Sequence, residues 1–203
     1  MKTATSAVRV KIARLGQIAV DLQEGKSFSV TRLTTIKSLC TDHAAARSFA
    51  VHIARLAKRK MDARDRPDFI KPKEWVRFKE VVSRSVLGLE RAEKEGIEES
   101  RSQLQESLRE LEKLQNTYEH QEWGPVRIMR SREALVVEYA VNCFLSKSQA
   151  PYWAYLMART YAERFDAGFF GGLVPKSAPM VEEIATFWRN YYLTAAEAEP
   201  ETK

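Results

Sequence analysis

The stretch that decides the fold class is Pro72-Lys-Glu-Trp-Val-Arg-Phe-Lys-Glu-Val-Val-Ser-Arg-Ser-Val-Leu-Gly-Leu89. Proline suits the first turn of a helix, and Glu74 follows where the helix macrodipole favours an acid. The large apolar side chains recur every three or four residues, namely Trp75, Phe78, Val82, Val86 and Leu89. This spacing places them on one face, so the segment predicts a long amphipathic helix.

The same helical period extends along the chain in both directions. Ser29, Asp42, Ser131 and Ser177 each stand where a side chain can accept the free amides of a following helix. Gly and Pro number only 8 and 7, which disfavours a turn-rich β fold. We therefore expect an all-α protein of about seven helices with a long central helical arm. The expected helices cover residues 8–22, 30–40, 43–61, 72–120 with a break at Gly96, 132–146, 152–165 and 178–193.

The breaks between these helices suggest three parts. We predict a basic helical bundle over residues 1–66, the arm or hairpin over 72–120, an aromatic-rich bundle over 125–193 and a flexible tail over 194–203.

Charge is unevenly divided along the chain. Residues 1–71 carry 15 Lys and Arg against 6 Asp and Glu, whereas residues 72–203 carry 18 against 21. A basic front half favours an anionic partner, and the mildly acidic back half favours a different one.

Four cations of the expected helix at 43–61 carry the first functional hypothesis. Arg47, Arg55, Lys58 and Arg59 fall on the side opposite its apolar residues, within about 120° of arc. They could follow a nucleic-acid backbone, or they could be an ordinary solvated face. The amino end of this helix is poor in Asn, Gln and Arg, which argues against sequence-specific reading of DNA.

Aromatic residues carry the second hypothesis. Thirteen of the 20 aromatics lie between Tyr139 and Tyr192, where they serve either as core or as anchors for a protein partner. Adjacent tyrosines such as Tyr191 and Tyr192 cannot both point inward from one helix. We expect the protein-binding residues to be Trp188, Tyr191, Tyr192, Phe169 and Phe170.

The sequence contains no catalytic motif. Cys40, His43 and His52 match no zinc spacing, and the loop from Gly171 to Ser177 lacks the spacing of a phosphate loop. The sequence therefore predicts a protein that is not an enzyme and that has no metal site and no cofactor. No run is long and apolar enough for a membrane span. Two cysteines without a partner pattern, Cys40 and Cys143, fit a reducing compartment.

Three segments resemble uncharacterised helical proteins of cyanobacteria and plastids: Thr34-Thr-Ile-Lys-Ser-Leu-Cys40, Tyr152-Trp-Ala-Tyr-Leu-Met-Ala-Arg-Thr-Tyr161 and Gly172-Leu-Val-Pro-Lys-Ser-Ala-Pro-Met180. The resemblance implies no activity and no site residues. It implies only a cytoplasmic location, with the plastid stroma as the alternative.

Together these observations predict a soluble, non-enzymatic helical adaptor or assembly factor that binds another protein through aromatic residues of its C-terminal bundle. The alternative is an RNA- or DNA-binding protein that uses its basic N-terminal bundle.

Overall fold

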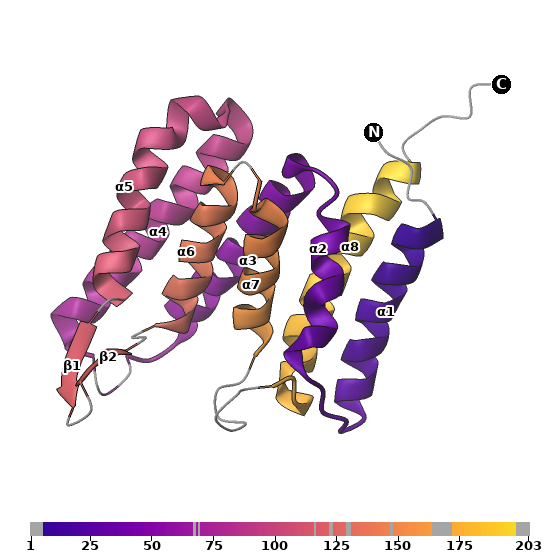
Figure 1. Ribbon diagram of the computed structural model, residues 1–203, viewed down its shortest axis with the longest axis horizontal. Helices are drawn as coiled ribbons and strands as arrows, with labels where there is room; N and C mark the ends of the chain where they lie inside the picture. The colour runs from indigo at the N-terminus through magenta and orange to yellow at the C-terminus, as the bar shows by residue number, and fades with distance from the viewer. Residues whose placement is uncertain are drawn as a thin grey trace.

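The computed structural model describes residues 6–66, 68, 70–115, 117–121, 124–128, 131–146, 148–163 and 172–197. The all-α fold class is confirmed, with eight α-helices in the described part of the chain (Figure 1). They are α1 (Ser6–Gln23), α2 (Thr35–Leu39), α3 (His43–Ala63), α4 (Pro72–Glu95), α5 (Ile97–Gln115), α6 (Arg132–Leu145), α7 (Ala150–Ala162) and α8 (Ala178–Glu197). Two short 3-10 helices, η1 (Val30–Thr34) and η3 (Pro175–Ser177), precede α2 and α8.

Most helix ends lie where the sequence predicts them, because their signals are local. The Asp42 carboxylate accepts the amide of Ala45 at 2.8 Å and starts α3, and the Ser131 hydroxyl accepts the amide of Ala134 at 3.2 Å and starts α6. Pro72 opens α4 in its first turn. Ser177 differs from the expectation, because its hydroxyl accepts the amide of Val174 within η3.

The central arm is a hairpin of two helices. Gly96 ends α4 with φ +110°, a backbone conformation that favours glycine, and α5 returns along α4. The expectation that the arm stays helical to residue 120 is wrong. A two-stranded antiparallel hairpin follows α5 instead, formed by β1 (Thr117–Gln121) and β2 (Gly124–Ile128) with Thr117 opposite Ile128.

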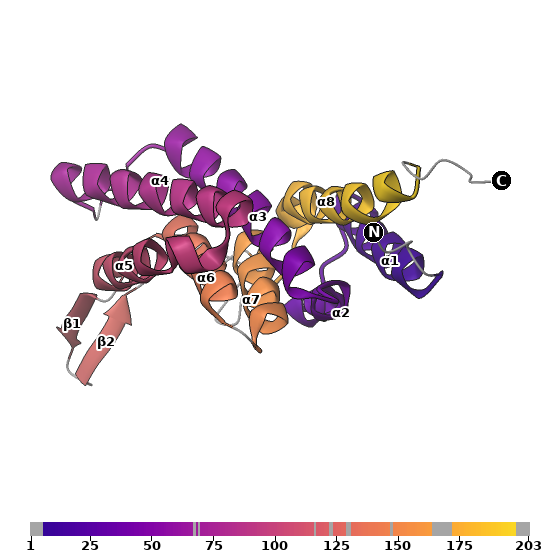
Figure 2. The ribbon, with the colours of Figure 1, turned by 90° about the horizontal axis from the view of Figure 1, so that it is seen from above.

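The helices form two layers (Figure 2). One layer contains α4, α3 and α8, and the other contains α5, α6, α7, α2 and α1. Contacts join neighbours within each layer and also cross between layers, with α3 packed on α6 and α7, and α8 packed on α1 and α7. The start of α1 and the end of α8 lie at the same end of the molecule.

One hydrophobic core runs through both layers. It contains Val8 and Leu15 of α1, Phe49 of α3, Phe144 of α6 and Trp188 of α8. The expected N-terminal and C-terminal bundles therefore share their core, since helices of the first pack directly on helices of the second.

Candidate functional site

The aromatic residues that the sequence singles out on α8 are mostly core. Trp188 is 0% exposed and Tyr192 only 6%. The ring of Trp188 lies 4.8 Å from that of Phe49 and 5.8 Å from that of Tyr192, which it stacks against. The Tyr192 hydroxyl donates to the Leu39 carbonyl. The prediction that Trp188 and Tyr192 form an exposed partner surface is therefore wrong.

The physical reason is that α8 has neighbours on several sides, since α1, α3 and α7 all contact it. Tyr191 and Tyr192 do not both point inward, as expected. Tyr191 is half-buried, and its ring stacks on that of Phe187 with the centroids 5.7 Å apart. Phe169 and Phe170 lie outside the residues that the structure describes.

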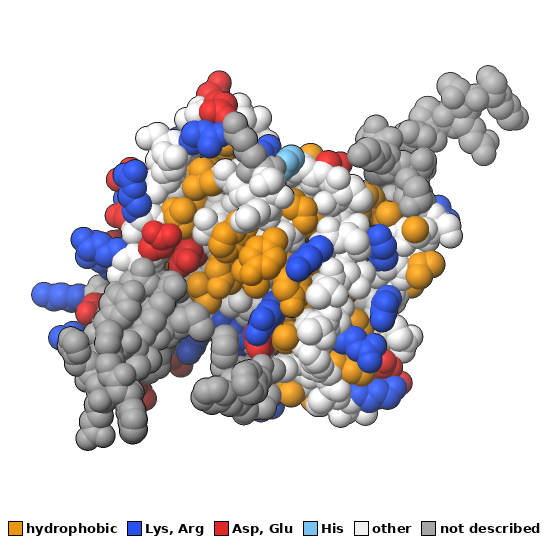
Figure 3. All heavy atoms as spheres, viewed as in Figure 1, with side chains coloured by type: hydrophobic (Ala, Val, Ile, Leu, Met, Phe, Trp, Pro, Cys, Tyr) orange, Lys and Arg blue, Asp and Glu red, His pale blue; other side chains and the backbone are white. Residues whose placement is uncertain are grey.

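A different group of aromatics reaches the surface, on α6 and α7. We call Tyr139, Tyr152, Trp153 and Leu156 the α6–α7 aromatic face. Tyr152 is 45% exposed, and the other three side chains are partly buried. The ring of Trp153 lies 5.7 Å from that of Tyr139 and 5.8 Å from that of Tyr152. Figure 3 shows hydrophobic side chains gathered over these two helices.

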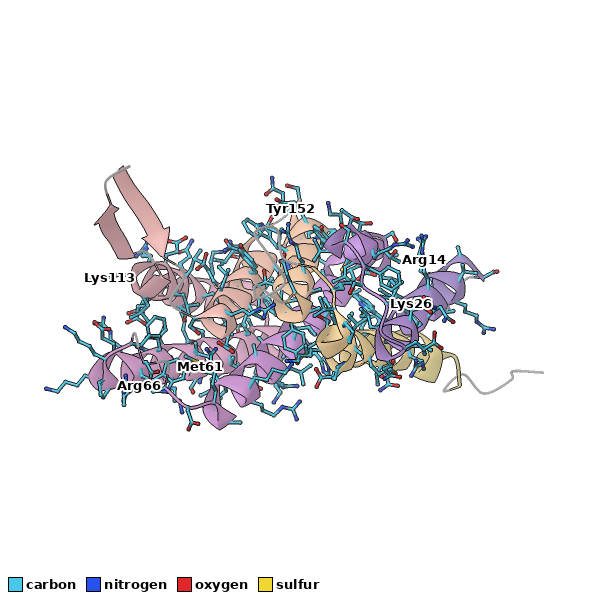
Figure 4. The ribbon with its side chains drawn as sticks, turned by 90° about the horizontal axis from the view of Figure 1, so that it is seen from below. Arg14, Lys26, Met61, Arg66, Lys113 and Tyr152 are labelled. Carbon is cyan, nitrogen blue, oxygen red and sulfur yellow. The ribbon has the colours of Figure 1, made fainter. Side chains whose placement is uncertain are left out.

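The local sequence explains why these rings point outward. Ala154, Met157, Ala158 and Tyr161 are buried, and their spacing of three and four residues turns that side of α7 to the core. Tyr152 and Leu156 are four residues apart and stand on another side. Figure 4 shows Tyr152 on the outer side of α7, in the layer opposite Met61 of α3.

A cation from α2 borders the α6–α7 aromatic face. The Lys37 ammonium lies 5.1 Å from the ring centroid of Tyr152 and 4.7 Å from that of Tyr155. Such cation–π contacts restrict all three side chains and place a positive charge beside the aromatic surface.

Three of the four predicted basic residues come together in the other layer. Arg55, Lys58 and Arg59 line a groove of about 460 Å³ between α3 and α4, which we call the α3–α4 groove. Its far wall includes Val86, Leu87 and Glu90 of α4. The groove is therefore basic on one wall and mixed apolar and acidic on the other.

Nearby carboxylates already engage two of these cations. Arg55 Nε lies 2.5 Å from Glu90 Oε1, and the Lys58 ammonium pairs with Asp62 one turn along α3. Exposed pairs of this kind contribute at most about 1 kcal/mol, so a stronger anion can displace them.

Arg47 does not belong with the other three, contrary to the prediction. Its guanidinium lies 5.9 Å from the Phe144 ring centroid, and burial lowers its pKa. The reason is that Cys143 and Phe144 of α6 contact Ala46 and Arg47 at this end of α3, which the periodicity of α3 alone cannot show.

His52 also lines the α3–α4 groove, a position that the sequence did not predict for it. Its ring lies 5.0 Å from that of Phe187. Burial lowers the pKa of His52 below its ordinary value of 6.5, and Arg59 lowers it further against the opposing effect of Glu183. The neutral imidazole is therefore the favoured form at pH 7.

The described residues include no cluster of three His, Cys, Asp or Glu side chains that could hold a metal ion. None of their helices has both the length and the apolarity needed to cross a membrane. No protein-family model, curated protein or solved structure matches the chain.

Proposed function

We propose that this chain is a non-enzymatic helical adaptor or assembly factor that binds another protein through the α6–α7 aromatic face. The observation that carries the proposal is the set of contacting rings of Tyr139, Tyr152 and Trp153 at the surface. Tyr and Trp dominate binding hot spots because they bury much area for little loss of conformational freedom. Rings that are already held in place by contacts with one another lose even less conformational freedom on binding.

The non-enzymatic part of the proposal rests on the sequence, which offers no set of nucleophile, base and orienting group. Two buried free thiols, Cys40 and Cys143, support a reducing compartment, and we propose the cytoplasm or the plastid stroma.

Nucleic-acid binding is the second candidate, and one observation favours it: Arg55, Lys58 and Arg59 line the same groove. A phosphate backbone would have to displace Glu90 and Asp62 from two of these cations. Binding through the α6–α7 aromatic face uses rings that already contact one another and does not require those carboxylates to be displaced, so we rank protein binding first.

A pulldown from extract of the cells that make the chain, at about 50 and 200 mM salt, separates the two candidates. Phosphate-dominated binding weakens by orders of magnitude over that range, whereas aromatic anchoring hardly changes. We expect a nuclease-resistant partner that Tyr152→Ala with Trp153→Ala releases at both salt concentrations.

Two control variants make the result specific. Val20→Ala removes an apolar side chain of the same exposure on α1, 44% against 45%, and should keep the partner. The triple variant Arg55→Glu, Lys58→Glu and Arg59→Glu should keep it too. A nuclease-sensitive partner that the triple variant loses and the aromatic variant keeps would replace the adaptor function with nucleic-acid binding.

A further inference from the structure

One of the three cations that line the α3–α4 groove has no carboxylate partner. Arg55 pairs with Glu90, and Lys58 pairs with Asp62. Arg59 lines the same groove and is exposed, and it makes no ion pair or hydrogen bond with any residue that the structure describes. The groove therefore offers one positive charge for which no carboxylate has to be displaced.

The charge of Arg59 acts inside the groove. His52 lines the groove as well, and burial is the largest cause of its lowered pKa. Arg59 is the next cause, and it lowers the pKa of His52 by more than Glu183 raises it. The carboxylates nearby therefore leave a positive potential in the groove, which favours an anionic ligand.

The wall that α4 provides exposes an aliphatic side chain. Leu87 is 63% exposed, and the buried Val86 beside it continues the apolar surface into the groove. The helices α3 and α4 lie side by side in one layer, so the two walls face the same ligand (Figure 2). A ligand that covers Leu87 removes apolar surface from water, which favours binding in proportion to the area covered.

We propose that the α3–α4 groove binds a short acidic segment of another protein, in which a Glu or Asp side chain stands beside a large aliphatic or aromatic one. The carboxylate pairs with Arg59, and the apolar side chain packs on Leu87 and Val86. The segment leaves the ion pairs of Arg55 and Lys58 intact. This site lies in the layer opposite the α6–α7 aromatic face, so it is a second and independent surface for a partner.

A nucleic-acid backbone fits this groove less well than an acidic segment does. It carries a charge at every nucleotide and therefore uses several neighbouring cations at once. Only Arg59 is available without the displacement of a carboxylate, and phosphates gain nothing from the exposed Leu87. The charge and the apolar wall together favour a peptide.

Selection from a random library of short displayed peptides on the full chain tests the proposal. Peptides that also bind the chain with Tyr152→Ala and Trp153→Ala are kept, which excludes ligands of the α6–α7 aromatic face. We expect the enriched peptides to combine Asp or Glu with a nearby Leu, Ile, Phe or Trp. The most enriched peptide is then synthesised, and its binding is measured by fluorescence anisotropy.

One variant on each wall locates the bound peptide. Arg59→Glu should weaken binding about tenfold or more, because like charges then oppose each other. Leu87→Ala should weaken it about fivefold or more, because less apolar surface is covered. The matched controls lie on α1: Arg14→Glu reverses another exposed cation, and Val10→Ala shortens an apolar side chain of similar exposure, 65% against 63%. Both controls should bind as the native chain does, and circular dichroism checks that each variant is folded.

Exchange of the two charges tests the pairing directly. A peptide in which Lys replaces the acidic residue should bind Arg59→Glu better than it binds the native chain. No enriched peptide, enrichment without acidic residues, equal binding by the native and Arg59→Glu chains, or no preference of the exchanged peptide for Arg59→Glu would each overturn the proposal. A DNA or RNA duplex that displaces the peptide, or a dimer of the chain that Leu87→Ala dissociates, would overturn it too, because the groove would then have a different occupant.

Discussion

At the scale of single residues, burial separates side chains that look alike in the sequence. Trp188 and Tyr152 are both aromatic residues of the C-terminal third, yet one is fully buried and the other 45% exposed. Replacing Trp188 should therefore lower the stability of the chain, whereas replacing Tyr152 should weaken the binding of a partner and leave stability nearly unchanged.

Trp188→Ala should lower the free energy of unfolding by about 3–5 kcal/mol, because it leaves a cavity beside Phe49 and Tyr192. Tyr152→Ala should change it by about 0.5 kcal/mol or less, as exposed substitutions usually do. Urea unfolding followed by circular dichroism measures both. A Trp188→Ala chain as stable as the Tyr152→Ala chain would contradict the burial of Trp188.

His52 should make stability depend on pH. Its pKa is lowered in the folded chain, so between pH 6.5 and that lower value the unfolded chain binds a proton that the folded chain does not. The contribution of His52 to stability is therefore present above about pH 6.5 and is lost as the pH falls towards the folded-state pKa.

Urea unfolding at pH 7.5, 6.5 and 5.5 checks this effect. The loss of stability on acidification should be smaller in His52→Gln than in the native chain, by at most about 1.4 kcal/mol for each pH unit. The matched control is His43→Gln, since His43 is exposed on the same helix. An identical pH dependence in the native chain and His52→Gln would exclude this role for His52.

At the scale of the elements, side-chain caps set where helices begin. Asp42 and Ser131 each satisfy an amide of the first turn, of α3 and α6 respectively. These two helices pack on each other across the layers, so fraying of either start exposes shared core.

Asp42→Ala and Ser131→Ala should each destabilise the chain by about 1 kcal/mol, within a range of about 0.5–2 kcal/mol. Ser102→Ala is the matched control: Ser102 is exposed within α5, where alanine is the better helix former, so stability should stay the same or rise slightly. Denaturant titrations compare the three variants. If all three variants have the same free energy of unfolding, the two caps contribute nothing to stability.

At the scale of the whole molecule, the shared core makes the N-terminal and C-terminal halves depend on each other. Trp75 lies in α4 and Trp188 in α8, in different parts of one hydrophobic cluster. Unfolding should therefore appear as one event to every probe.

Tryptophan fluorescence and far-ultraviolet circular dichroism should give coincident urea transitions. A fragment of residues 125–203 should not fold by itself, because it lacks α3 beneath α6 and α7 and α1 beside α8. A cooperative transition in that fragment would show instead that the expected C-terminal bundle is an independent domain.

The sequence by itself determined the class of fold and most helix boundaries, because both depend on interactions within a few residues. Proline at 72, the caps Asp42 and Ser131 and the apolar period of α4 act locally, and the structure has each of them as predicted. The β1–β2 hairpin was missed because its five-residue strands lack a strong alternating pattern.

Only the tertiary structure decided which surfaces are available. Helical periodicity places Arg47 with Arg55 and offers both Trp188 and Tyr152 as anchors, but it does not say which neighbour will cover each face. The packing of α6 on α3 removes Arg47 from the basic group, and the packing of α8 against α1, α3 and α7 buries Trp188. A cavity lined by Lys60, Arg132 and Tyr161 exists only because α3, α6, α7 and α8 meet there. Local rules establish the helices, whereas burial depends on contacts between helices that no local pattern encodes.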